Sequence, residues 1–213
     1  MKHRINKQFL ISCFLCLAAM TASAQDAMKV LDETASRIRK SGGVKVTFSA
    51  TNFSGLDEQG STNGTMLLQD KKYQLQTTGS TTWYDGETQW CYVSENEEVN
   101  VSNPTQKEMQ AVNPYAFLDV YKQGYATSVK ESSLRGSATY EVHLTAQKEE
   151  MDAQEIYIDI RKSDYVPLCI RVRQGKDWSR LALLSFQGGQ KFGKDTFTFP
   201  KEKYPDAEII DLR

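Results

Sequence analysis

Apolar and polar residues alternate along most of the chain from residue 46 onward, which is the pattern of β-strands that bury one face. Turn-like sequences such as Arg135-Gly136-Ser137 and Gly188-Gly189 separate these strands. The pattern predicts about eleven strands. Besides residues 65–68, 73–77 and 81–101, the alternating apolar positions are Val46, Phe48, Ala50, Tyr140, Val142, Leu144, Ile156, Ile158, Ile160, Leu168, Ile170, Val172, Ala182, Leu184, Phe186, Phe197 and Phe199.

One helix is predicted before the strands and a second one among them. Residues 26–40 carry apolar side chains at steps of three and four, and Gly42-Gly43 ends the pattern. Residues 104–123 read as a helical insertion, because Asn113-Pro114 is an N-cap followed by a first-turn proline. Each segment has an apolar side to bury, formed by Met28, Leu31, Ala35 and Ile38 in the first and by Phe117, Leu118 and Tyr121 in the second.

These elements predict a mostly β fold with helices (α+β), in a single domain over residues 25–213. Two stacked sheets would leave the helices without a surface to cover. The economical arrangement is one open, strongly curved antiparallel sheet, an incomplete barrel, with the helices covering its concave apolar face.

The segment from Thr81 to Val101 predicts a β-hairpin with large aromatic side chains on one face. Asp85-Gly86 is a strong signal for a two-residue type I′ turn, which would pair Trp83 with Thr88. With a further turn at residues 96–97, the alternation of side chains groups Trp83, Trp90, Tyr92, Val99 and Val101 on one face. The opposite face is mostly polar and carries Tyr84, Glu87, Gln89, Cys91 and Asn100.

Residues 1–24 have the three parts of a secretory signal peptide. Basic residues come first, residues 9–20 are apolar, and Ala22-Ser23-Ala24 supplies the small residues of a cleavage site. A transmembrane anchor is the alternative, but this apolar stretch is too short to span about 30 Å of hydrocarbon. A lipoprotein cleavage site at Cys13 is another, but it comes too early in the apolar stretch. The sequence therefore predicts an exported, soluble protein that begins near Gln25.

Removal of residues 1–24 changes the charge and the cysteine count. It discards three basic residues and no acidic ones, so 26 Lys and Arg become 23 against 27 Asp and Glu, a net charge of −4. This mildly acidic balance disfavours nucleic acid as a partner. Cys91 and Cys169 remain, either as a disulfide formed in an oxidising compartment or as two buried free thiols.

The sequence offers little for catalysis. His143 is the single histidine after residue 24. It lies between Val142 and Leu144 in a predicted strand, so its side chain points to the face opposite theirs, as expected for a solvent-facing side chain. No Gly-x-Ser-x-Gly sequence, metal-ligand spacing or phosphate-binding loop occurs. We therefore predict a binding protein, not an enzyme, with no cofactor and no metal.

Two kinds of binding are compatible with this pattern. In the first, an apolar concave face accepts acyl chains, since burial of each CH₂ contributes about 0.8 kcal/mol. In the second, a secreted β-rich module binds another lipid, a protein or a glycan through outward residues such as Tyr84, Gln89 and Arg171. The chain is predicted to be a monomer in either case.

The order of several segments resembles the LolA family, the periplasmic carriers of outer-membrane lipoproteins in Gram-negative bacteria. The resemblance covers residues 26–213. Its most specific parts are the Asp-Gly-x-x-x-Trp hairpin at residues 85–90 and the Phe-x-Phe-Pro ending at residues 197–200. The other matching parts are the first helix, the strand with Val46 to Ala50, residues 64–68, Asn113-Pro114 and residues 209–211.

The resemblance implies that acyl chains of a lipoprotein bind non-covalently in an apolar cavity lidded by helices. It also implies two membrane partners, an inner-membrane lipoprotein-releasing transporter and an outer-membrane acceptor. An arginine that closes the lid in proteobacterial members is replaced here, so Lys71 and Lys72 are the candidate lid latch. The predicted cavity residues are Phe48, Leu75, Trp83, Trp90, Tyr92, Val99, Val101, Phe117, Leu118, Ile158, Ile170 and Leu184.

Overall fold

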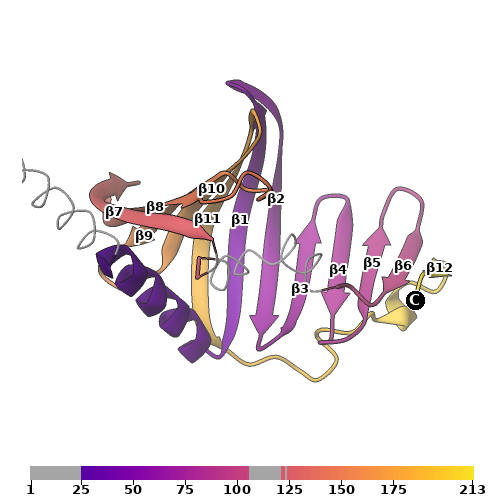
Figure 1. Ribbon diagram of the computed structural model, residues 1–213. Helices are drawn as coiled ribbons and strands as arrows, with labels where there is room; N and C mark the ends of the chain where they lie inside the picture. The colour runs from indigo at the N-terminus through magenta and orange to yellow at the C-terminus, as the bar shows by residue number, and fades with distance from the viewer. Residues whose placement is uncertain (1–24, 106–120, 123) are drawn as a thin grey trace, which may run out of the picture.

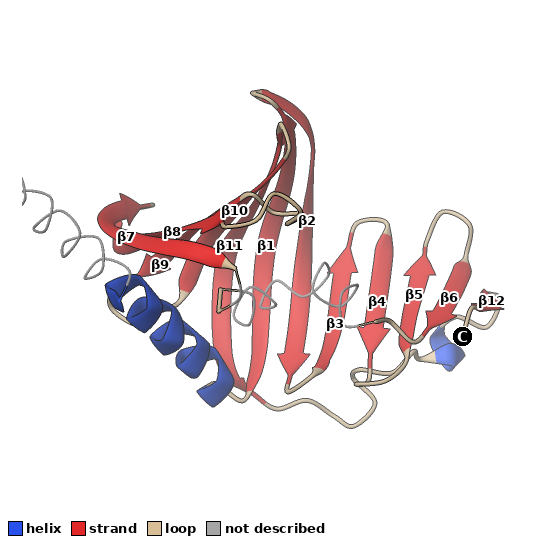
Figure 2. Ribbon diagram, in the orientation of Figure 1, coloured by secondary structure: helices blue, strands red, loops and turns tan. Residues whose placement is uncertain are grey.

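The computed structural model describes residues 25–105, 121–122 and 124–213, which form one helix and one sheet of 12 strands (Figures 1 and 2). The mostly β class predicted from the sequence is confirmed. The helix spans residues 25–40. The strands are β1 (Gly43–Ser54), β2 (Asp57–Gln69), β3 (Lys72–Thr77), β4 (Ser80–Tyr84), β5 (Gln89–Val93), β6 (Glu98–Ser102), β7 (Tyr125–Leu134), β8 (Ser137–Ala146), β9 (Glu155–Arg161), β10 (Pro167–Gln174), β11 (Asp177–Gln190) and β12 (Glu208–Asp211), with a 3₁₀ turn at Lys201–Lys203.

The strand order is β12-β6-β5-β4-β3-β2-β1-β11-β10-β9-β8-β7, so among the described residues the sheet is open and β12 and β7 are its edges. All neighbours are antiparallel except β12 and β6, which run parallel. The long connection from β11 to β12 runs past the lower ends of β1 to β4 and finishes beside β6 (Figure 1). Edge strands β7 and β12 were not among the predicted strands.

Residues 197–199 were predicted as a strand and do not form one. They lie in a turn closed by the bond from the Thr198 N–H to the Asp195 carbonyl, and the 3₁₀ turn follows. The alternation of Phe197 and Phe199 therefore reflects two aromatic contacts of an irregular segment rather than a place in the sheet.

The helix agrees with the predicted one in extent and in its buried side. Ala27, Leu31 and Ala35 have no exposed surface, and Val30 and Ile38 are also buried. Gly42 follows the helix with φ of +65°, the left-handed conformation that commonly ends a helix and that glycine adopts without strain. The helix therefore has one apolar side, which packs on the sheet.

Register assigns every strand residue to one of two faces. The row Val46, Met66, Leu75, Thr82 and Cys91 crosses five strands on the face that the helix covers, which we call the helix-side face. On this face a single cluster joins the helix to eight neighbouring strands, in sheet order β4, β3, β2, β1, β11, β10, β9 and β8. Its buried strand members are Val44, Val46, Phe48, Met66, Leu68, Tyr73, Tyr84, Val142, Leu144, Ile156, Ile158, Ile160, Ile170 and Leu183. The other side is called the outer face.

The second predicted helix, residues 104–123, lies almost entirely outside the described residues. Tyr121 is described and is buried in the helix-side cluster. Its hydroxyl donates a hydrogen bond of 2.5 Å to Asp32 Oδ1 on the first helix, and Lys122 Nζ lies 3.3 Å from the same oxygen.

Gly64 allows the Phe48 ring to pack closely against β2. A Cβ atom added at Gly64 would lie 2.4 Å from the Phe48 ring and 2.6 Å from the Gln76 carbonyl oxygen. Gly64→Ala is therefore expected to lower the free energy of unfolding by about 1–2 kcal/mol, measured by urea denaturation. Asn63→Ala, at the exposed neighbouring position, is the control and should change stability by less than about 0.5 kcal/mol. Equal effects of the two changes would contradict the packing of Phe48 on Gly64.

Candidate functional site

The helix-side face is the candidate binding surface because it is apolar from β8 to β2. Four predicted cavity residues lie on it, namely Phe48, Leu75, Ile158 and Ile170. Ile158 is fully buried, while Leu75 is half-buried in β3, beyond the strands that form most of the cluster. Whether these residues bind a ligand stays a prediction.

The predicted hairpin register is wrong by two residues. Trp83 pairs with Trp90 rather than with Thr88, and the loop has four residues. The Asp85 carboxylate accepts hydrogen bonds from the N–H groups of Glu87 and Thr88 and so stabilises the longer loop. A shift of two keeps the parity, so Trp83, Trp90, Tyr92, Val99 and Val101 do share one face, as predicted.

That shared face is the outer face, which corrects their predicted place in the cavity. Trp83 pairs with Gln74, whereas the helix-side residue Tyr73 pairs with Tyr84. The aromatic side chains are instead covered by the segment between β11 and β12. Trp83 contacts Phe199 and Tyr204 edge-to-face, with ring centroids 5.5 and 6.0 Å apart, and the Tyr92 ring lies 4.4 Å from Tyr204. They form a second, separate core.

The polar side of the hairpin continues the helix-side face. Tyr84 and Gln89 therefore are not outward residues, in contrast to the prediction, whereas Arg171 does lie on the outer face. The Tyr73 hydroxyl donates a 2.6 Å hydrogen bond to Gln89 Oε1, and burial raises the pKa of Tyr73. The helix-side face thus changes from aliphatic at β8–β11 to tyrosine, threonine and amide groups at β3–β5.

Other predicted site residues have different positions. Leu184 is 57% exposed at a bulge of β11, and Leu183 takes its place in the cluster. Lys71 and Lys72 are exposed at the turn between β2 and β3, and their role as a latch stays a prediction. Phe117 and Leu118 lie outside the described residues.

Of the two alternatives for Cys91 and Cys169, a disulfide or two free thiols, the structure has the free thiols. Five strands separate β5 from β10, at about 4.8 Å per strand spacing, and the two side chains lie on opposite faces. A disulfide requires Cα atoms within about 7 Å. Burial raises the pKa of the Cys169 thiol, which disfavours the reactive thiolate.

The outer face of β7–β10 carries a network of charged side chains. Arg171 Nη2 lies 2.8 Å from Glu141 Oε2 and 3.4 Å from Asp159 Oδ2, and Lys130 Nζ lies 2.8 Å from Glu141 Oε1. Asp159 is 5% exposed, and this burial raises its pKa despite the nearby guanidinium. His143 stacks on Tyr157 with ring centroids 4.1 Å apart. These contacts pair each of the two carboxylates with at least one cation, which is typical of a structural network.

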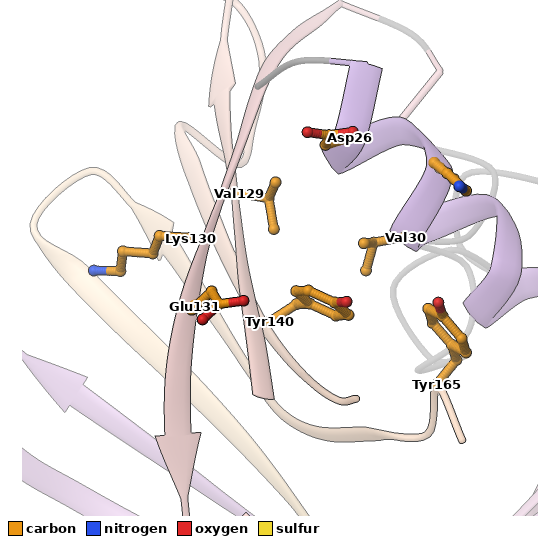
Figure 3. A pocket seen from close by; sticks show the side chains of 8 residues that line it. Asp26, Val30, Val129, Lys130, Glu131, Tyr140 and Tyr165 are labelled. Carbon is orange, nitrogen blue, oxygen red and sulfur yellow. The ribbon is translucent and has the colours of Figure 1, made fainter. Parts of the chain in front are cut away.

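A pocket of about 390 Å³ lies where the first turns of the helix pass over strand β7 (Figure 3). Val30 and Val129 line it from the helix and from β7, and the near-parallel rings of Tyr140 and Tyr165 lie 6.3 Å apart at its base. Sequence patterns missed it because Tyr165 belongs to a turn. The remaining lining residues are Asp26, Lys29, Lys130 and Glu131.

Two further properties limit the chemistry of the described residues. No three His, Cys, Asp or Glu side chains within residues 25–105 and 121–213, leaving out 123, are close enough together to hold a metal ion. In the same part of the chain, no helix is both long enough and apolar enough to cross a membrane.

Comparison with known proteins places this architecture in a family. Residues 17–176 match the family described as outer membrane lipoprotein carrier protein LolA. No curated protein matches the chain. A Thermus thermophilus protein described as an uncharacterized conserved protein has 12% identity, with 87% of this chain and 99% of the other covered and a TM-score of 0.59. LprF from Mycobacterium bovis also has 12% identity, with coverages of 84% and 98% and a TM-score of 0.51.

The fold is thus an open, mostly antiparallel sheet with a helix on its apolar face, and these solved structures share it. The chain belongs to the LolA family of outer membrane lipoprotein carrier proteins.

Proposed function

We propose that this protein binds the acyl chains of lipoproteins on its helix-side face and carries them from the inner to the outer membrane. The observation that carries the proposal is the continuous apolar face from β8 to β2, in a chain that belongs to a family of lipoprotein carriers. Binding of this kind is non-covalent and needs no cofactor. The polar groups of Tyr73, Tyr84 and Gln89 would lie toward the polar end of such a ligand, and Leu75, the apolar residue beside them, would still contact its acyl chains.

A concave sheet would support this role. In Figure 1 the strands stand upright from β3 to β6 and lie nearly horizontal at β7 and β8, above the helix. We infer that the sheet curves around the helix.

Export would place the carrier where it is needed. In this proposal residues 1–24 are a signal peptide that is removed, and residues 25–213 act in the periplasm as a monomeric domain. The partners are then acylated lipoproteins, an inner-membrane lipoprotein-releasing transporter that delivers them and an outer-membrane acceptor that receives them. Native mass spectrometry of the protein purified from the periplasm should show a co-purifying triacylated peptide and a chain that starts near Gln25.

Leu75→Glu is expected to weaken uptake of a fluorescent triacylated peptide by at least about tenfold, since a carboxylate would lie in contact with the acyl chains. Leu75 is half-buried, so the fold should survive, as circular dichroism can verify. Leu184→Glu introduces the same charge at an exposed bulge and is the matched control. Absence of uptake by the unmodified protein, or equal losses in both variants, would reject the proposal.

A further inference from the structure

The edge strand β7 and the pocket beside it form one continuous surface. All ten residues of β7 pair with β8 without a bulge, and the strand contains no proline. Every second residue of such a strand directs its N–H and C=O groups away from β8, its one neighbour in the part of the chain that the structure describes. The opposite edge, β12, has only four residues. Long regular edges of this kind are templates for an additional strand.

The pocket lies on the helix-side face directly beside the β7 edge (Figure 3). Val129 and Glu131 point to the helix-side face and line the pocket, and Val30 and Asp26 lie across from them on the helix (Figure 3). The base of the pocket, formed by Tyr140 of β8 and Tyr165 of the β9–β10 turn, lies on the inner side of β7. In an antiparallel strand added to β7, the residue opposite Val129 would point to the helix-side face, and a large side chain there would lean across Val129 into the pocket.

Charges on β7 are already paired within the sheet. Lys130 Nζ lies 2.8 Å from Glu141, and Glu131 Oε1 lies 2.6 Å from Lys162 Nζ. An incoming strand therefore needs no charge of its own at these positions. Asp26 and Lys29 place one charge of each sign at the rim of the pocket, so the rim favours neither acidic nor basic side chains. The aromatic base and the two valines instead favour an apolar side chain.

Tyr165, at the base of the pocket, has an unusual backbone conformation. Its φ is +57°, a left-handed conformation that is strained for a bulky side chain. The Tyr165 N–H donates to the Arg161 carbonyl, and Arg161 binds Asp164 through two contacts of 2.8 Å, which fixes the turn. The result is a tyrosine ring parallel to Tyr140 at the base of the pocket.

We propose that the β7 edge binds an extended segment of another protein as an added antiparallel strand, with one large aromatic or aliphatic side chain in the pocket. Backbone hydrogen bonds along β7 would supply affinity, and the pocket would supply selectivity. The proposal is independent of lipid binding, because it uses the edge of the sheet rather than the middle of its apolar face.

A fluorescein-labelled peptide of ten residues, with alternating threonine and valine and a central phenylalanine, provides the test. It should bind the full exported chain in fluorescence anisotropy, and it should slow hydrogen exchange at every second β7 amide. Serine in place of the phenylalanine should weaken binding by at least about tenfold. N-methylation of alternate peptide amides should abolish binding, because it removes the donors that pair with β7.

Two protein variants separate pocket binding from loss of fold. Val129→Asp and Tyr165→Gly should each weaken peptide binding by at least about tenfold, and glycine keeps the left-handed turn accessible. Leu56→Ser, at a 98% exposed hairpin position, is the control and should bind normally. The proposal would be overturned if the phenylalanine peptide did not bind, or if the N-methylated peptide bound equally well. It would also be overturned if the peptide slowed hydrogen exchange only at amides outside β7, or if the protein without peptide formed a dimer in which the β7 amides were already protected.

Discussion

Trp83→Ala is expected to lower the free energy of unfolding by about 3–5 kcal/mol, the range for truncating a large aromatic core residue. Trp83 is 3% exposed and contacts Phe199 and Tyr204, so alanine would leave a cavity between the hairpin and the segment that follows β11. Urea denaturation followed by circular dichroism measures the loss.

The same variant distinguishes the outer face from the ligand-binding face. Because Trp83 lies on the face opposite the helix, the folded fraction of Trp83→Ala should still take up the triacylated peptide with unchanged affinity. If Trp83 instead lined the ligand cavity, Trp83→Ala would reduce uptake of the peptide and would lower stability less.

Phe199→Ala provides a partner variant for Trp83→Ala. The two changes remove the same edge-to-face contact, so the double variant should be more stable than the sum of the single effects implies, by about 0.5–1.5 kcal/mol. Full additivity would mean that the two rings do not pack together.

Local patterns in the sequence were sufficient for the helix and for most strands. The apolar spacing from Met28 to Ile38 requires a helix with one buried side, and alternation in the strands around Val142 and Ile158 requires one buried face. The grouping of Trp83 with Trp90 and Tyr92 was also predictable, because a register error of two residues leaves parity unchanged.

The face to which that group belongs could not be predicted from the hairpin alone. Residues 81–84 are all buried, so β4 has no exposed side to mark its orientation. The choice depends on the pairing of Gln74 with Trp83 in β3, and on a C-terminal segment that sequence reasoning treated as a strand. When a segment distant in the sequence covers the second face of a strand, as the segment after β11 covers β4, the alternation of apolar and polar residues in that strand is lost.

The pocket was equally invisible to sequence patterns. It combines the helix, the edge strand and a turn, and each contributes only a few residues. Tyr165 occupies a left-handed position that statistics assign to glycine or asparagine. Its unusual backbone could be recognised only once the turn between β9 and β10 was known.

Arg171→Met is expected to cost roughly 2–3 kcal/mol near about pH 7, somewhat less than for a fully buried pair because the Arg171 side chain is 36% exposed. The change leaves Asp159 buried without its guanidinium, while Glu141 keeps Lys130 as a partner. Arg173→Met, which removes a contact to the less buried Glu155, is the matched control and should cost less.

The cost of Arg171→Met should decrease as the pH falls. Burial already raises the pKa of Asp159, and Arg171 opposes that rise, so its removal raises the folded-state pKa further. A carboxyl whose pKa is higher in the folded than in the unfolded state costs stability as the pH rises through the interval between the two values. Below that interval the carboxyl is protonated in both states and the cost disappears.

Urea denaturation of Arg171→Met and the unmodified protein between about pH 7 and about pH 5 tests this expectation, since the difference in stability should narrow toward the acidic end. Adding Asp159→Asn removes the buried charge, so the double variant should recover most of the loss at neutral pH. A difference that stays constant with pH, or a double variant no more stable than Arg171→Met, would mean that Arg171 stabilises the outer face through packing rather than through its charge.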